Sequence, residues 1–242
     1  MLNNQFTNFR KFLHYITLYG FKLTIIKVFS KKNFKFKINL LTRPLSYYLD
    51  YGKKINIGII GCGNHSFSSI VFYLSQSSKV NLYWCYDIDK KRSHKIAFSY
   101  NFKKIIYDLS SNDSKKIFLN TDIIYIASNH SSHIHYLKFF EKLKSKIYVE
   151  KPIVTNWDDY NVLKKLNIKD RLFTGFNRPN SRFINIVFNK INQLKYTNNL
   201  NLSFFIIGHK IDSSHWYRNK NEGTRICGNL SHWIDLSLLF LQ

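Results

Sequence analysis

Short apolar segments alternate with segments of helical periodicity between residues 54 and 150. The apolar segments are rich in isoleucine, valine and aromatic residues, and they predict strands over residues 55–60, 80–86, 104–107, 122–127 and 146–149. The segments between them predict helices over residues 68–77, 89–100 and 131–144. Strands that alternate with helices form βαβ units, so the pattern predicts an α/β fold with a parallel sheet buried on both faces.

The alternation becomes looser after Pro152. Helices are predicted over residues 156–166, 180–194 and 228–241, and strands over residues 172–176 and 199–208. We therefore divide the chain into an N-terminal arm of residues 1–53, an α/β domain of residues 54–152 and a shortened C-terminal α/β domain of residues 153–242.

The N-terminal arm combines positive charge with apolar residues at near-helical intervals. Nine basic residues and a single acid, Asp50, lie between Met1 and Gly52. A basic amphipathic helix of this kind suits an anionic membrane surface. Packing of its apolar side on its own domain is the alternative. Pro44 marks the end of the arm, because proline disfavours helix at the preceding residue.

The composition permits a packed core but is strongly basic. The 242 residues are 45% hydrophobic, and 37 basic residues against 14 acidic ones give a net charge of +23. This charge suggests an anionic partner. However, the sequence holds 29 Lys, 29 Ile and 26 Asn but only two Ala, a skew that AT-rich codons explain equally well. No zinc-finger or RNA-recognition motif is present, so we expect no specific nucleic-acid partner.

The cysteines and the apolar segments bear on the compartment. The chain has three cysteines, Cys62, Cys85 and Cys227. Their odd number and the absence of C-x-x-C spacing argue against a disulfide framework and against a thiolate metal site. No segment reaches the ~18 uninterrupted apolar residues of a membrane span, and no secretory signal is evident. We expect a cytoplasmic protein without a metal, with peripheral membrane contact through residues 1–53 left open.

A glycine-containing loop follows the first predicted strand and precedes the first predicted helix, with the sequence Gly61-Cys62-Gly63-Asn64-His65-Ser66. In a dinucleotide site the first glycine makes the tight turn, and the second lets the backbone approach the pyrophosphate. The third position needs a small residue, and Ser66 also offers a hydroxyl to a phosphate oxygen. The loop therefore predicts a cofactor site that includes Asn64 and His65, with an ordinary βα turn as the alternative.

Asp87 ends the second predicted strand, 24 residues after Gly63. An acid at this spacing accepts hydrogen bonds from the adenosine ribose of NAD. It repels the 2′-phosphate of NADP, although the three basic residues at positions 90–92 offset that repulsion. NAD is the expected cofactor and NADP the alternative. A turn or helix-capping carboxylate is the alternative role of Asp87.

Polar residues also follow the strands predicted over residues 122–127 and 146–149. Ser128, Asn129 and His133 lie where ligands bind in open α/β sheets, and a solvent-facing position is the alternative for His133. Glu150 and Lys151 follow the strand after that, where they offer a carboxylate to a ribose and an ammonium to a substrate oxygen.

From about Lys54 to Gln242 the chain resembles the glucose–fructose oxidoreductase/inositol dehydrogenase (Gfo/Idh/MocA) family. The resemblance rests on an ordered set of motifs: Gly-Cys-Gly, Asp-Ile-Asp-Lys, Asp-Ile-Ile-Tyr-Ile-Ala-Ser, Glu150-Lys151-Pro152, Gly175-Phe-Asn177-Arg178 and a last segment from Gly223 to Asp235 that contains His232. It implies a Rossmann domain followed by an α/β domain that binds a sugar or nucleotide-sugar beside the nicotinamide.

The resemblance also implies roles for individual residues. His232 corresponds to the catalytic histidine and would take the proton of the reacting hydroxyl as hydride passes to NAD. Lys151 would touch that hydroxyl and the nicotinamide, and Glu150 would help to hold the cofactor. Further candidates for substrate contact are Asn177, Arg178, His215, Asn229 and Asp235, with a loop-packing role as the alternative for His215.

Two departures from the family pattern matter for function. Gly228 and Asn229 stand where many members carry an acid before the histidine, so the second acid/base group is in doubt. Only 92 residues run from Lys151 to Gln242, so we expect a C-terminally truncated member that lacks most of its second sheet and with it the usual dimer contacts. The sequence predicts an NAD(P)-dependent oxidoreductase of sugars, in monomeric or oligomeric form. The alternatives are an inactive cofactor-binding homologue and a membrane or nucleic-acid binder acting through the arm.

Overall fold

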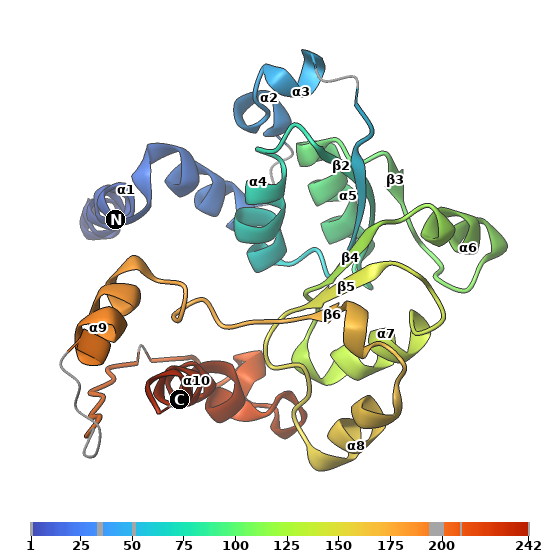
Figure 1. Ribbon diagram of the computed structural model, residues 1–242. Coiled ribbons are helices and arrows are strands. Elements are labelled where there is room, and N and C mark those ends of the chain that lie inside the picture. Colours follow the sequence, from blue (N-terminus) through green and yellow to red (C-terminus); the bar gives the residue numbers. More distant parts are fainter. Residues whose placement is uncertain (1, 33–35, 50–51, 194–200, 209, 242) are drawn as a thin grey trace. The chain divides into compact units, whose positions relative to one another are not determined.

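The computed structural model describes residues 2–32, 36–49, 52–193, 201–208 and 210–241. It contains a six-stranded sheet in the order β3-β2-β1-β4-β5-β6 (Figure 1). The strands are β1 (Ile55–Ile60), β2 (Val80–Tyr86), β3 (Lys104–Ile105), β4 (Ile123–Ile126), β5 (Lys146–Val149) and β6 (Leu172–Phe173). The pairs β1–β2, β1–β4 and β2–β3 run parallel, which confirms the predicted α/β fold with a parallel Rossmann-type sheet.

The chain forms two compact units. One contains the residues up to Ser128 together with Leu143–Ile147, and the other contains Asn129–Lys142 and the residues from Tyr148 onward. Besides the first five strands, the first unit contains α1 (Leu2–Lys31), α2 (Asn39–Thr42), α3 (Ser46–Leu49), η1 (Ser66–Ile70), α4 (Val71–Leu74), α5 (Lys90–Tyr100) and α6 (Asn112–Leu119), with β5 ending in the second unit.

One face of the sheet carries the main core of the first unit. The buried side chains of β1 and β2 meet those of η1, α4 and α5, and the core also takes in Ile26 and Ile38 from the N-terminal arm. The Tyr100 hydroxyl donates to the Phe67 carbonyl at 2.7 Å, which links α5 to η1 inside this core. The second part of the arm therefore packs on its own domain.

The opposite face of β1 and β2 is built around Trp84. Its indole lies directly over Gly58, where an added Cβ would collide with the ring. The indole nitrogen donates to Thr121 Oγ1 at 2.8 Å, and the ring packs on Phe118 of α6. Helix α6 was missing from the elements expected from the sequence. Its signal is local, because the Ser111 side chain caps the helix by accepting from the Ser114 N–H.

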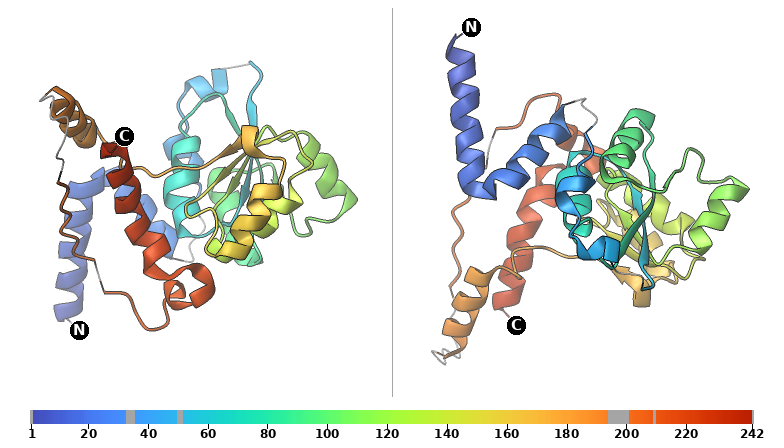
Figure 2. Two further views of the ribbon diagram at one scale, coloured as in Figure 1. Left: turned by 60° about the horizontal axis from the view of Figure 1, so that its bottom comes forward. Right: turned by 90° about the horizontal axis from the view of Figure 1, so that it is seen from above.

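Helix α1 is bent at Gly20, whose backbone lies outside the helical region (Figure 2). By length and composition, its segment Phe9–Lys31 could cross a membrane, with a mean hydropathy of 1.2. The criterion of ~18 uninterrupted apolar residues does not select this segment, because Lys22 and Lys27 interrupt it, whereas the mean hydropathy tolerates these two charges.

The second unit is mainly helical. Its elements are η2 (His130–Ser132), α7 (His133–Phe139), α8 (Trp157–Lys165), η3 (Lys169–Arg171), α9 (Arg182–Gln193), η4 (Trp216–Arg218), η5 (Lys220–Glu222), η6 (Ile226–Leu230) and α10 (Ser231–Phe240), besides β6. The strand predicted over residues 199–208 is wrong for residues 201–208, which form no strand, and its first two residues lie outside the described part. Residues 201–208 alternate in polarity, but no strand of the described structure pairs with them. Without such a partner the backbone hydrogen bonds of a strand cannot form.

Candidate functional site

The loop after β1 is a tight turn whose two glycines have different surroundings. Gly61 has a φ of +86°, and a Cβ there would lie 2.6 Å from the Ala127 carbonyl oxygen. Gly63 faces open space, with no atom within 4 Å of the position a Cβ would take. The first glycine is thus required by the fold, whereas the second leaves the backbone accessible to a ligand.

Ser66 supports this loop from inside. It is fully buried, and its hydroxyl donates to the Gly61 carbonyl. This bond uses the one proton of the hydroxyl, so Ser66 holds the turn and does not donate to a phosphate oxygen as predicted. Asn64 and His65 are exposed beside it.

Asp87, directly after β2, organises the same end of the sheet. Its Oδ2 accepts from the Cys62 N–H at 2.6 Å, and its Oδ1 accepts from the Asp89 N–H at 2.8 Å. The carboxylate thereby has a fixed orientation, and each oxygen keeps a lone pair for a ribose hydroxyl. Burial raises the pKa of the neighbouring Cys62 thiol, and Cys85 and Asp87 raise it further, so this thiol stays protonated and unreactive.

The loop after β4 is fixed by a buried carboxylate. Glu222 accepts from the Ser131 N–H at 3.1 Å and from the Ser131 hydroxyl at 2.7 Å, and His130 Nδ1 contacts the Glu222 carbonyl at 2.9 Å. His133 is fully buried with its Nδ1 2.9 Å from the Pro152 carbonyl, so it does not face solvent. Ser128 is half-buried and Asn129 is exposed.

Lys151 occupies a partly buried position in the second unit. Its ammonium donates to the Gly228 carbonyl at 2.6 Å, which connects the end of β5 to η6. Burial lowers the pKa of Lys151, Arg178 lowers it further, and Glu150 acts in the opposite direction. An ammonium carries three protons, so two remain for a substrate.

His232 lies within the electrostatic reach of the same groups. Burial lowers the pKa of His232 to about 4, and the charges of Lys151 and Arg178 add to this effect. Its Nδ1 is buried without a hydrogen-bond partner among the described residues, and its ring packs edge-on against Phe176. The imidazole is therefore neutral at pH 7 and available to accept a proton.

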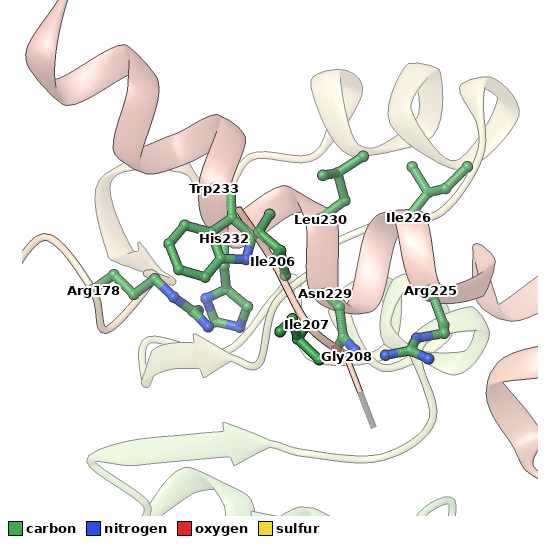
Figure 3. Close-up of a pocket in the computed structure, with 10 residues that line it drawn as sticks. All are labelled: Arg178, Ile206, Ile207, Gly208, Arg225, Ile226, Asn229, Leu230, His232 and Trp233. Carbon is green, nitrogen blue, oxygen red and sulfur yellow. The ribbon is translucent and has the colours of Figure 1, made fainter. Parts of the chain in front are cut away.

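An open pocket of about 640 Å³ lies beside His232 (Figure 3). Its walls come from residues 206–208, from η6 and from the start of α10. Arg178 and Arg225 bring positive charge to it, and no acidic side chain lines it. Arg178 lies over the Trp233 ring at 4.6 Å from the centroid, a contact that holds the guanidinium in place. Such a pocket favours an anionic ligand.

The remaining predicted substrate residues have different positions. Asn229 lines the pocket beside His232. Asn177 is exposed, and neither it nor His215 lines the pocket. His215 Nδ1 accepts from the Tyr217 N–H, and the ring packs against Trp216, which is the loop-packing arrangement. Burial raises the pKa of Asp235, one of whose oxygens lacks a partner in the described structure.

Sequence reasoning missed Glu222 and Arg225. Glu222 carries no local signal, because an acid between polar residues is usually exposed. Arg225 lies within the last family-like segment, and its position over Gly208 places it in the pocket wall. Among the described residues, no group of His, Cys, Asp and Glu side chains is arranged to hold a metal ion.

The lowered pKa of His232 predicts an unusual titration. Because the folded-state pKa of about 4 lies below the ordinary value of 6.5, the unfolded chain binds more protons between these pH values. Stability should therefore fall as the pH falls through this window. Side-chain NMR should show no protonation of His232 at pH 6, and His232→Gln should reduce the acid sensitivity. A His232 midpoint near 6.5 would contradict this geometry.

The sequence matches the family model GFO_IDH_MocA, described as an oxidoreductase family with an NAD-binding Rossmann fold, over residues 55–174. A search of curated proteins found no significant match. Among solved structures, the chain is similar to GenD2 from gentamicin A biosynthesis in complex with NAD, with a TM-score of 0.62 and 14% identity over 79% of this chain and 55% of that one.

Two further structures show the same fold. A putative NADPH-dependent oxidoreductase from Desulfitobacterium hafniense matches with a TM-score of 0.61 and 16% identity over 78% of this chain and 56% of its own. The WlbA dehydrogenase from Bordetella pertussis, in complex with NADH and UDP-GlcNAcA, matches with a TM-score of 0.51 and 18% identity, over 60% of this chain and 41% of its own. The chain thus spans about half the length of these proteins.

Proposed function

Because the chain carries the NAD-binding Rossmann domain of the Gfo/Idh/MocA oxidoreductase family, we propose that it is a dehydrogenase that oxidises a hydroxyl group of an anionic sugar derivative. The observation that carries this proposal is the convergence of Lys151, Arg178 and His232. These residues come from three separate parts of the sequence, and the charges of Lys151 and Arg178 act on His232 within the second unit.

The residues present fit a nicotinamide dinucleotide. The open space over Gly63 gives the pyrophosphate access to the backbone, and Asp87 offers oriented carboxylate oxygens to the adenosine ribose. Asn64 and His65 follow Gly63 in the loop after β1, and Ser128 and Asn129 lie in the loop after β4. We propose all four as further cofactor contacts, with Glu150 and His133 in supporting positions. The carboxylate favours NAD, and NADP is the alternative.

The cofactor would supply the hydride acceptor. Residues of this chain would take the proton of the substrate hydroxyl and stabilise the negative charge that develops on its oxygen. His232 accepts the proton of the substrate hydroxyl, because its lowered pKa keeps the ring neutral at pH 7. Lys151 donates a hydrogen bond to the oxygen as negative charge develops there. Its bond to the Gly228 carbonyl fixes the direction of the ammonium. Asn229 hydrogen-bonds the substrate but provides no second base.

The charge of the pocket supports an anionic substrate. Two guanidinium groups, those of Arg178 and Arg225, line it. Guanidinium groups bind carboxylates and phosphates in bidentate fashion. A sugar acid, a sugar phosphate or a nucleotide-linked sugar carries such a group, and the UDP-linked ligand of the WlbA structure is of the last kind. We place the reacting hydroxyl at His232 and the anionic group toward Arg225.

A substrate panel tests this proposal. Purified protein with NAD is incubated with neutral sugars, sugar acids, sugar phosphates and nucleotide-linked sugars, and NADH formation is followed by absorbance. We expect turnover of an anionic member, with KM raised about 10- to 100-fold by Arg225→Gln and kcat little changed, since a hydrogen bond to a charged group is lost. Lys220→Gln, at the exposed first residue of η5, serves as the charge-matched control. Preferred oxidation of neutral sugars, unaffected by Arg225→Gln, would contradict the assignment.

A further inference from the structure

The surroundings of helix α1 change at Gly20, whose φ of 75° and ψ of 162° break the helix (Figure 2). After this bend, Thr24, Ile26 and Ser30 are buried, and Ile26 belongs to the core of the first unit. Before it, no side chain from Phe9 to Tyr19 is buried. The helix therefore has two parts. The part after Gly20 is anchored to the core of the first unit, and residues 9–19 contribute no side chain to that core.

The projecting half is amphipathic. At 3.6 residues per turn, one arc of about 120° carries five of the seven apolar or aromatic side chains of residues 9–19. They are Phe9, Phe12, Leu13, Ile16 and Tyr19. The opposite arc carries Arg10, Lys11, His14 and Thr17, together with one apolar side chain, Leu18. Phe9 is 59% exposed and Leu13 is 46% exposed, so the apolar face meets solvent. Amphipathic helices of soluble domains normally bury such a face.

The charge around this face has one sign. The first 49 residues contain nine basic residues and no Asp or Glu. Lys22 is exposed just after the bend, and the Lys27 ammonium lies 4.6 Å from the Tyr19 ring centroid, at the end of the projecting half. An apolar helix face bordered by lysine and arginine complements a lipid surface, because acyl chains take the face and anionic headgroups take the charges. A nucleic acid would complement the charges and leave the face exposed.

We propose that residues 9–19 bind the surface of an anionic membrane, with the apolar face in the boundary between headgroups and acyl chains. The long side chains of Arg10 and Lys11, on the opposite arc, then extend back to the lipid phosphates at the membrane surface. The helix lies along the surface and does not cross the bilayer, because the bend at Gly20 commits the second half to the core of the domain. The proposed oxidoreductase would thereby act on substrates at the membrane. This binding does not depend on catalysis.

Vesicle co-sedimentation tests the proposal with the full chain. The wild type is mixed with vesicles of equal parts phosphatidylglycerol and phosphatidylcholine, or of phosphatidylcholine alone. Phe12→Glu with Ile16→Glu changes the apolar face, and His14→Glu with Thr17→Glu introduces two acids on the polar face as the matched control. None of these four side chains is buried, so circular dichroism and the unfolding midpoint should stay unchanged.

We expect binding to the phosphatidylglycerol vesicles, weakened more than about tenfold by the apolar-face pair, since two apolar side chains leave the lipid. The polar-face pair should weaken it several-fold less, and alkaline carbonate should release the protein. The proposal is overturned by a wild type that does not bind vesicles, by equal losses in the two pairs, by resistance to carbonate, or by binding to RNA in place of vesicles.

Discussion

Replacement of Lys151 by methionine is expected to lower kcat for the preferred sugar by about 100- to 1,000-fold, the usual effect of removing a donor to a developing oxyanion. The ammonium is partly buried, and its bond to the Gly228 carbonyl leaves two protons for the substrate. The affinity for NADH should change little, because the loop after β1 and Asp87 are untouched. The measurement is the steady-state rate together with an NADH titration.

A second readout needs no substrate. The charge of Lys151 helps to lower the pKa of His232, so Lys151→Met should raise that pKa, as followed by side-chain NMR. Lys165→Met, on the exposed face of α8, is the matched control and should alter neither the rate nor the titration. Lys151→Arg keeps the charge but not the geometry, and should keep the His232 titration while losing turnover. An active Lys151→Met enzyme would remove Lys151 from the mechanism.

Alanine substitution at the two glycines of the loop after β1 should affect stability differently. Gly61→Ala is expected to destabilise the fold by about 1–3 kcal/mol or more, because a side chain at a φ of +86° is strained and its Cβ would lie 2.6 Å from the Ala127 carbonyl oxygen. Gly63→Ala meets no neighbour within 4 Å and should leave the unfolding midpoint unchanged. Thermal unfolding followed by circular dichroism measures both.

The affinity for NADH should also distinguish the Gly61→Ala and Gly63→Ala variants. In Gly63→Ala a methyl group occupies the space over the backbone through which the pyrophosphate would approach, so NADH affinity should fall although the protein is stable. In Gly61→Ala, loss of affinity should accompany loss of stability. Equal affinity of Gly63→Ala and the wild type would show that the dinucleotide does not approach this turn.

The sheet of the first unit could be predicted because its strands are buried on both faces. Isoleucine-rich segments such as residues 55–60 have few other places in a soluble protein, and the loop and the acid that follow the first two strands indicated a dinucleotide fold. The short helix α6 was missed because its signal is one capping serine. The strand over residues 201–208 was predicted from alternation alone, and alternation does not provide the neighbouring strand that pairing requires.

The residues of the candidate site were likewise predicted only in part from the sequence. Lys151 and His232 were expected from the order of family-like motifs, since no local feature of the sequence joins residues 81 positions apart. Glu222 and Arg225 were missed because their roles depend on tertiary contacts, with Ser131 in one case and the pocket wall in the other. Ser66 was assigned to the ligand, but a buried hydroxyl takes the nearest carbonyl, and only the structure shows which one that is.

The central claim, a dinucleotide site that serves an oxidoreductase, is tested most directly by an NADH titration followed by cofactor fluorescence. The wild type is compared with Asp87→Ala and with Asp113→Ala, an exposed acid of α6 that serves as the control. We expect saturable binding that Asp87→Ala weakens about 10-fold or more, the cost of losing a hydrogen bond to a charged group, and that Asp113→Ala leaves unchanged. A folded wild type that does not bind NADH or NADPH, or an Asp87→Ala variant that binds as the wild type does, would contradict the account.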